Sequence, residues 1–280
     1  MNASAGGQEF EFTDSDFNRL RDLVYAHTGI ALSDAKRQLV YSRLARRLRK
    51  LNLTTFGEYC STVEAGGAEE MQELTNAITT NLTSFFREQY HFDQLAAEAL
   101  PQAQNQRAAT RRVRLWSAGC STGEEPYSIA IVLREAFARL QNWDVKLLAT
   151  DIDSKVVQTA AAGVYDAERL KGMSVERRTR WFTRDAAGPD TYSAATELKS
   201  LITFKKLNLL DPWPMKGPFD IIFCRNVVIY FDKDTQRRLF ERMAETQQVG
   251  GWLFIGHSEN LFNVTRRYKL VGRTVYRRTE

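Results

Sequence analysis

Hydrophobic residues recur at two different spacings along the chain, and the change between them divides it in two. From about 13 to 79, apolar positions recur every three to four residues, which predicts helices that each bury one face. From Val113 onward, short apolar runs alternate with helical patterns, an arrangement typical of a parallel sheet covered by helices. The sequence therefore predicts an α/β domain preceded by an all-helical one.

Capping signals place the helices of the first part. Thr13 with Asp16, and Thr55 with Glu58, match the pattern in which a capping hydroxyl and an acid three residues later bond each other's backbone N–H groups. A fourth helix is predicted from about 69 to 79. We expect residues 1–10 to be a disordered leader, 11–90 the helical domain, and 91–112 a linker helix and loop.

The second helix, expected to open at Ser33 or Asp34, has both an apolar and a basic stripe. Its inward positions are predicted to be Leu39, Val40, Leu44 and Leu48. Its basic positions share another face and form what we call the basic ridge, consisting of Arg43, Arg46, Arg47 and Lys50. No acid occurs between 36 and 50, so a docking surface for an acidic partner is as plausible as a solvated face.

The second part begins with a strand, a glycine-bearing turn and a helix over 113–133. Such a turn, here containing Gly119 and Gly123, allows a ligand to approach the backbone at the carboxyl edge of a parallel sheet. It lacks the glycine spacing and lysine of phosphate-binding loops, and Glu124 and Glu125 stand at the helix start. These acids favour a ligand with hydroxyls or positive charge, such as S-adenosylmethionine; the alternative is that they only complement the helix dipole.

Further elements follow at regular intervals. A strand over 145–150 ends in Asp151 and Asp153, of which one is expected to cap a helix and the other to accept hydrogen bonds from a ribose. A small antiparallel subdomain is predicted at about 188–205, with short strands at 191–193 and 202–204. A buried strand covers 219–224, and Asp234 or Thr235 is expected to cap the helix that ends at Gly250-Gly251. Strands are predicted at 252–256 and, at the sheet edge, 270–276.

Composition narrows the function classes. The net charge is +5, and the three cysteines and three histidines have no metal-ligand spacing, so we expect no metal site. No apolar stretch is long enough to span a bilayer, and we expect a cytoplasmic protein without membrane insertion. His257, Ser258 and Glu259 are adjacent, so their side chains cannot relay a proton as a catalytic triad does.

Five segments together resemble one family, the chemotaxis receptor methyltransferases of the CheR type. They are Thr-Thr-Asn-Leu-Thr-Ser-Phe-Phe-Arg-Glu at 79–88, Trp-Ser-Ala-Gly-Cys-Ser-Thr-Gly-Glu-Glu-Pro-Tyr-Ser-Ile-Ala at 116–130, Thr-Asp-Ile-Asp at 150–153, Phe-Asp-Ile-Ile-Phe-Cys-Arg-Asn-Val-Val-Ile-Tyr-Phe-Asp at 219–232, and Gly-His-Ser-Glu-Asn at 256–260. The resemblance covers nearly the whole chain. It implies a helical domain followed by a Rossmann-like methyltransferase domain over 113–280 that carries the small antiparallel β-subdomain.

The resemblance also implies a cofactor and the residues around it. The cofactor would be S-adenosylmethionine, with S-adenosylhomocysteine as the product, and the reaction would esterify glutamate side chains. The cofactor-binding residues would be Asn81, Thr83, Arg87, Glu125 (or Glu124), Asp151, Asn208, Leu209, Asn226 and Val227. Arg87 and Tyr230 would lie close to the transferred methyl group and act in catalysis.

The implied partner is the cytoplasmic signalling domain of chemoreceptors. The basic ridge would complement its glutamate-rich helices, and the β-subdomain is a candidate for binding a receptor C-terminal peptide. A nucleic-acid methyltransferase is the alternative enzyme, but the segment after the 219–224 strand lacks the Asp/Asn-Pro-Pro-aromatic motif of base amino-nitrogen methylation, and we expect no nucleic acid partner. A third alternative is a cofactor-binding regulatory module without turnover.

Overall fold

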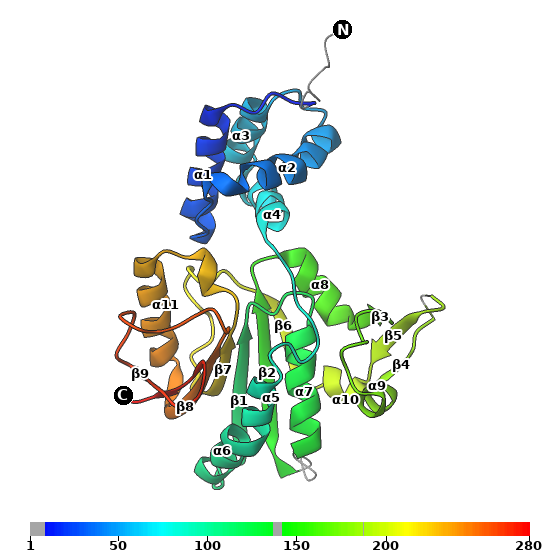
Figure 1. Ribbon diagram of the computed structural model, residues 1–280, viewed down its shortest axis with the longest axis vertical. Coiled ribbons are helices and arrows are strands. Elements are labelled where there is room, and N and C mark those ends of the chain that lie inside the picture. The colour runs from blue at the N-terminus through cyan, green and yellow to red at the C-terminus, as the bar shows by residue number, and fades with distance from the viewer. Residues whose placement is uncertain (1–8, 137–141, 187) are drawn as a thin grey trace. The chain divides into compact units, whose positions relative to one another are not determined.

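The computed structural model describes residues 9–136, 142–186 and 188–280 (Figure 1). The chain divides into two compact units at the boundary between Thr80 and Asn81. Most of the predicted leader, 1–10, lies outside the described residues. Of its described end, Phe10 donates its backbone N–H to the Tyr41 hydroxyl over 3.1 Å and packs edge-on against Phe56.

The first unit is all helical, as the sequence predicts. Its elements are α1 (Asp14–Thr28), the 3₁₀ turn η1 (Asp34–Lys36), α2 (Arg37–Leu51), α3 (Phe56–Ala65) and α4 (Gly67–Ile78). Both predicted capping boxes are present, at Thr13 and at Thr55. The predicted inward residue Leu39 is instead 38% exposed, because the buried stripe of α2 runs through Val40, Leu44 and Leu48 and Leu39 is rotated off it.

The segment 81–90, which the sequence assigned to the helical domain, belongs to the second unit. Phe85 packs edge-on against Tyr165 and Phe182, and Phe86 packs against Phe92. These aromatic contacts anchor the segment in the core of the second unit, which explains the position of the boundary.

A seven-stranded sheet forms the centre of the second unit. In chain order its strands are β1 (Arg112–Ala118), β2 (Asp144–Asp151), β6 (Ile202–Lys206), β7 (Phe219–Cys224), β8 (Gln247–Ile255), β9 (Tyr268–Leu270) and β10 (Val275–Arg278). They lie side by side in the order β6-β2-β1-β7-β8-β10-β9. The first five are parallel, and β10 and β9 are antiparallel additions at one edge.

Helices cover both faces of this sheet. The helices and helical turns of the second unit are α5 (Tyr90–Gln94), the π-helix η2 (Leu95–Ala99), α6 (Leu100–Gln106), α7 (Glu124–Ala136), α8 (Ser154–Ala162), α9 (Val175–Trp181), which lies beside the small antiparallel sheet, α10 (Thr196–Lys199), the 3₁₀ turn η4 (Val228–Tyr230) and α11 (Lys233–Glu245). Alternate strand residues enter two separate cores: Ile221 and Phe223 face α5–α7, whereas Ile222 and Cys224 face α11. This arrangement is the predicted Rossmann-like fold.

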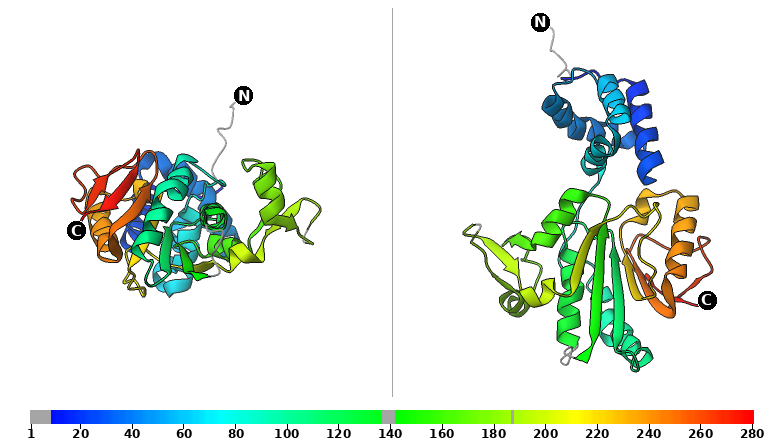
Figure 2. Two further views of the ribbon diagram at one scale, coloured as in Figure 1. Left: turned by 90° about the horizontal axis from the view of Figure 1, so that it is seen from below. Right: turned by 180° about the vertical axis from the view of Figure 1, so that it is seen from behind.

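The small antiparallel sheet is present, but its predicted position is wrong. It consists of β3 (Val164–Asp166), β4 (Phe182–Arg184) and β5 (Thr191–Ala194), and it lies at the β6 edge of the main sheet (Figures 1 and 2). The segment 202–204, predicted to belong to it, is β6 and pairs in parallel with β2. The short sequence of this strand does not specify its partner, because strand pairing depends on segments that are distant in the chain.

Three further predicted boundaries are corrected. Asp232, rather than Asp234 or Thr235, caps α11 by accepting the Thr235 N–H. Gly250-Gly251 lie within β8 instead of ending a helix. The predicted edge strand 270–276 spans instead the last residue of β9, the turn at 271–274 and the start of β10.

Candidate functional site

The sheet order places a crevice between β1 and β7. The chain runs outward from β1 through β2 to β6, and then returns to the other side of β1 to form β7. In parallel α/β sheets, ligands bind outside the carboxyl ends of the strands at such a change of direction. The residues after β1, β2, β7 and β8 therefore make up the candidate site.

The turn after β1 brings backbone close to this crevice. Gly119 has a φ of +90°, which favours glycine, and a Cβ built on it would lie 2.2 Å from Cγ2 of Val227. A side chain at 119 thus does not fit unless Val227 moves. The turn after β1 and the segment after β7 meet across the crevice at this point.

Asp151 ends β2 and turns its carboxylate into the same region. Its Oδ2 accepts the Ser121 N–H over 2.8 Å, and its Oδ1 accepts the Asp153 N–H over 3.0 Å. Burial raises the pKa of Asp151 to about 6, against the opposing effect of these bonds. Of the two acids, Asp153 is the one that caps α8, and it also accepts a 2.9 Å bond from the side-chain amide of Asn81.

The two acids at the start of α7 have different partners. Glu124 is buried and pairs with Arg169 and with the Thr122 hydroxyl. Glu125 accepts bonds from the Ser117 hydroxyl over 2.7 Å and from the Arg225 guanidinium over 2.9 Å. Burial raises the pKa of Glu125, although Arg225 opposes the effect. Glu125 is therefore the acid that connects β1 with the segment after β7.

The segment after β7 is held by one carboxylate. Glu259 is 5% exposed and accepts backbone N–H groups from Asn226 (3.0 Å), Val228 (3.0 Å) and Gly256 (2.6 Å). Asn226 has a φ of +58°, which the carboxylate stabilises by bonding the N–H on either side of Val227. Burial raises the pKa of Glu259 despite these bonds. Tyr230 follows in η4 and is half-buried.

Arg87 lies on the segment 81–88 and is half-buried. Its guanidinium donates to the Leu82 carbonyl over 2.8 Å, and its own carbonyl accepts a bond from Arg225. The preceding residue, Phe86, donates its N–H to the Ser128 hydroxyl of α7 over 2.9 Å. The segment is thus tied to α7 and to the residue after β7, which brings Arg87 to the crevice.

Three other predicted cofactor residues lie on the segment after β6 and on the segment 81–88. Asn208 and Leu209 follow β6 and are buried, and the Asn208 side chain accepts the Leu210 N–H over 3.0 Å. Thr83 is half-buried on the 81–88 segment.

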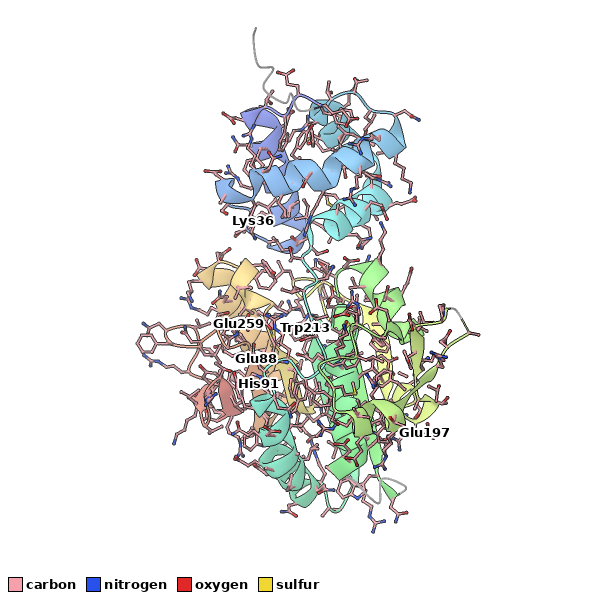
Figure 3. All side chains as sticks on the ribbon, turned by 45° about the vertical axis from the view of Figure 1, so that its right-hand side comes forward. Lys36, Glu88, His91, Glu197, Trp213 and Glu259 are labelled. Atoms are coloured by element: carbon pink, nitrogen blue, oxygen red, sulfur yellow. The ribbon has the colours of Figure 1, made fainter. Side chains whose placement is uncertain are left out.

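Three charged residues of the site were not selected as functional from the sequence. Glu88 pairs with Arg225 (3.3 Å) and with His257 (2.9 Å), and burial, which alone would raise its pKa, is outweighed by these partners, so the pKa is lowered. Glu88 and Glu259 are labelled in Figure 3 in the same region of the second unit. Arg225 and Glu259 lie within segments that carried the resemblance, so the signal was present, but their partners are distant in sequence.

Only part of the basic ridge is exposed to solvent. Arg43 donates to the carbonyls of Ile78 and Thr79 at the end of α4, over 2.8 and 2.7 Å. Arg47 pairs with Glu70 and Glu73 and its side chain is 14% exposed. Arg46 and Lys50 are exposed. Arg43 and Arg47 therefore hold α2 against α4, and Arg46 and Lys50 are the exposed members of the ridge.

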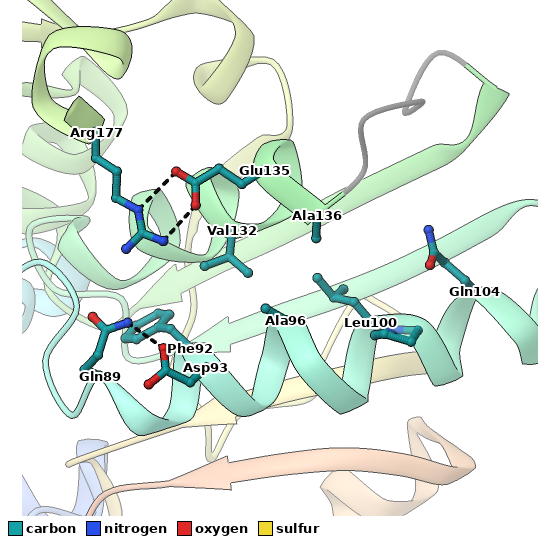
Figure 4. A pocket seen from close by; sticks show the side chains of 11 residues that line it. Gln89, Phe92, Asp93, Ala96, Leu100, Gln104, Val132, Glu135, Ala136 and Arg177 are labelled. Carbon is teal, nitrogen blue, oxygen red and sulfur yellow. Dashed lines mark hydrogen bonds and ion pairs between the residues drawn. The ribbon is translucent and has the colours of Figure 1, made fainter. Parts of the chain in front are cut away.

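A hollow of about 380 Å³ lies between α5–α6 and α7, lined by Phe92, Ala96, Leu100 and Val132 among others (Figure 4). Its charged rim residues are paired: Arg177 donates to Glu135 over 2.7 and 3.0 Å, and Gln89 donates to Asp93 over 2.8 Å. In these two pairs the polar groups satisfy each other and do not converge on a ligand. Among the described residues there is no cluster of metal-ligating side chains, and no helix there could cross a membrane.

Comparison with known proteins agrees with this geometry. Residues 15–79 match the CheR methyltransferase all-alpha domain, and residues 81–277 match the CheR methyltransferase SAM binding domain. The chain is 47% identical over 274 residues to chemotaxis protein methyltransferase 2 of Pseudomonas aeruginosa, covering 97% of this chain and 95% of that protein. It is 44% and 42% identical to the chemotaxis protein methyltransferases of Salmonella typhimurium and Escherichia coli, each over 96% of this chain and 92% of the relative. The chain belongs to the CheR methyltransferase family and is an S-adenosylmethionine-dependent methyltransferase.

Proposed function

We propose that this enzyme transfers the methyl group of S-adenosylmethionine to glutamate side chains of chemoreceptor signalling domains in the cytoplasm. The observation that carries the proposal is that Arg225 links Glu125 to the Arg87 carbonyl, while Asp151 bonds the turn after β1, on a chain whose relatives are named chemotaxis protein methyltransferases. The β-subdomain is in this proposal the site for a receptor C-terminal peptide.

The residues present fit the cofactor. The glycine turn packs its backbone at 119 directly against Val227, a residue proposed to border the cofactor. The buried carboxylates suit a ligand with ribose hydroxyls and positive charge, Asp151 bonding the ribose and Glu125 lying near the turn. In the proposal Asn81 and Thr83 line the pocket, Asn208 and Leu209 flank the adenine, and Asn226 and Val227 border the methionine end.

The chemistry requires positioning more than acid–base help. When bound, S-adenosylmethionine supplies a methyl group attached to a sulfonium, and the neutral thioether S-adenosylhomocysteine is the leaving group. The acceptor carboxylate, with a reference pKa of about 4.3, is already ionised at neutral pH and needs no general base. Arg87 would hold this carboxylate and Tyr230 would orient it, so that the oxygen meets the methyl carbon in line. Such orientation can supply roughly 7–11 kcal/mol of the rate enhancement.

The direct test uses radiolabelled S-adenosylmethionine and a purified receptor signalling fragment. Label should enter the fragment and be released by mild base, because methyl esters hydrolyse there and N-methyl groups do not. A fragment in which the candidate glutamates are replaced by alanine should remain unlabelled. Base-stable label, or none, would refute the proposed substrate.

Cofactor affinity should depend on the ionisation of Asp151. Ribose hydroxyls donate to the carboxylate form, and the pKa of Asp151 is raised to about 6, so affinity should be greatest above pH 6 and fall as the pH drops through it. One unit below the pKa the loss approaches tenfold. Asp151→Asn should weaken binding by about 1–3 kcal/mol at pH 7.5 and flatten the profile. Calorimetry at pH 5 and 7.5 measures both effects; equal affinity of the folded variant at pH 7.5 would remove Asp151 from the site.

Receptor docking is proposed to use the free half of the basic ridge. Arg46 and Lys50 are exposed one helical turn apart on α2, so they can attract an acidic receptor helix. Arg46→Glu with Lys50→Glu should lower methylation at low receptor concentration by about tenfold, and added salt should lower the wild-type rate in the same way. Cofactor affinity should not change.

The matched control makes the same charge change elsewhere, as Arg266→Glu with Lys269→Glu, two residues that are also exposed. Arg47 is left intact because its pairs with Glu70 and Glu73 stabilise the helical unit. Normal methylation by the α2 variant at both salt concentrations would mean that the ridge only keeps the surface solvated.

A further inference from the structure

Arg225, the first residue after β7, has a buried guanidinium between two acids. Its side chain is 2% exposed. Nη1 donates to Glu125 over 2.9 Å, and Nη2 lies 3.3 Å from Glu88. Nη2 also donates to the backbone carbonyl of Arg87. One side chain thus joins three segments of the crevice: the end of β7, the start of α7 and the segment 87–88.

These contacts support the backbone of Arg87, the residue proposed to hold the acceptor carboxylate. Arg87 sits between Phe86 and Glu88, whose φ values of +54° and +59° are uncommon for residues with side chains. A backbone with two such residues needs outside support to keep one conformation. Two contacts supply it: Ser128 accepts the Phe86 N–H, and Arg225 bonds the Arg87 carbonyl and the Glu88 carboxylate.

We propose that Arg225 is a positioning residue for methyl transfer: its guanidinium fixes the backbone of Arg87 against the start of α7 and so aims the Arg87 side chain at the acceptor carboxylate. The proposal rests on the proposed function of Arg87. It assigns Arg225 no contact with the reacting atoms. Its effect on turnover therefore passes through Arg87.

Only arginine suits this role. The planar fork directs Nη1 to Glu125 and Nη2 to the Arg87 carbonyl at the same time, whereas the single ammonium of lysine cannot occupy both positions. Arg225→Lys keeps the buried positive charge between the two acids while it removes the fork. Because displacement of a catalytic group by about 1 Å can cost on the order of 10²-fold in rate, turnover should be sensitive to this change.

The experiment is a double-mutant cycle on receptor-fragment methylation by the full chain, with both substrates saturating. Arg225→Lys should lower kcat by about 10- to 100-fold in the wild-type background. In the Arg87→Ala background the same change should lower kcat by less than about threefold, because the side chain that it positions is already gone. A role confined to stability predicts equal losses in both backgrounds.

Arg107→Lys is the matched control. Arg107 pairs over 2.6 Å with Asp220, a buried acid near the opposite end of the same strand. Its replacement also removes an arginine–carboxylate pair from β7, but far from the site, so kcat should stay within about twofold of wild type. Glu88→Gln is a milder second variant, because it removes one of the two acids that bind the Arg225 guanidinium. It should lower kcat by about three- to tenfold in the wild-type background and have no such effect in the Arg87→Ala background.

The outcomes separate the two proposals. If the wild-type enzyme does not methylate the fragment, the proposed function is wrong and the role of Arg225 in it is refuted as well. If the wild type is active and the losses from Arg225→Lys and Arg87→Ala multiply, the proposed function stands and the positioning role is refuted. If Arg225→Lys does not fold, the same comparison is made with Glu88→Gln, and multiplying losses there refute the role.

Discussion

Replacing Arg87 with alanine should lower turnover on the receptor fragment by about 100-fold and leave the fold nearly unchanged. Removing one preorganised donor from a developing reaction centre typically costs about 10²- to 10³-fold in kcat. The guanidinium is half-buried, and its hydrogen bond to the Leu82 carbonyl is local. The neighbouring backbone is held by Ser128 and Arg225, which this substitution does not alter.

Steady-state kinetics with both substrates varied, together with thermal unfolding, test this prediction. Arg87→Lys should recover little activity if the carboxylate is held by both arms of the guanidinium. Arg266→Ala, which removes an exposed arginine elsewhere, is the control and should retain full activity. If both Arg87 variants turn over at near the wild-type rate, Arg87 has no part in the chemistry.

Features determined by neighbouring residues were predicted well from the sequence. The capping boxes at Thr13 and Thr55 depend on side chains three residues apart, and both are present. The cap at Asp153 and the burial of the 219–224 strand are local in the same sense. Each of these elements could be placed before any knowledge of the fold, because its signal and its partner lie within one turn or one strand.

Features determined by distant partners could not be predicted in this way. The strand at 202–206 pairs with β2, more than fifty residues earlier, and was assigned to the wrong sheet. The ion pairs of Arg47 with Glu70 and Glu73 could not be predicted either, because both acids follow it by more than twenty residues. The pairing of Arg225 with Glu88 crosses most of the second unit. The resemblance named the residues along the crevice but not the charges that hold them in place.

Glu259 is the clearest of these unpredicted groups, and its substitution should have the second large effect. Its carboxylate accepts the N–H groups of Asn226, Val228 and Gly256, and it is almost fully buried. Glu259→Gln offers one acceptor oxygen in place of two and turns an NH₂ group toward backbone donors. At roughly 1–3 kcal/mol for each buried donor left unsatisfied, the free energy of unfolding should fall by about 3 kcal/mol.

The loss of stability should be accompanied by a specific loss of function in the molecules that remain folded. Asn226 and Val227 are the residues proposed to border the methionine end of the cofactor, and their backbone conformation depends on Glu259. S-adenosylmethionine affinity should therefore fall by at least tenfold, measured by calorimetry at a temperature where unfolding experiments show the variant folded.

Asp220→Asn provides the matched comparison for this experiment. Asp220 is, like Glu259, a buried acid; it lies in β7 and accepts the Arg114 N–H over 2.8 Å and the Arg107 guanidinium over 2.6 Å. Its replacement should lower stability to a similar degree but leave cofactor affinity unchanged, because it lies at the end of the strand away from the crevice. If both variants bind the cofactor like the wild type, Glu259 stabilises the fold without shaping the site. If both lose affinity equally, the loss reflects general destabilisation, and the 225–228 segment has no special dependence on Glu259.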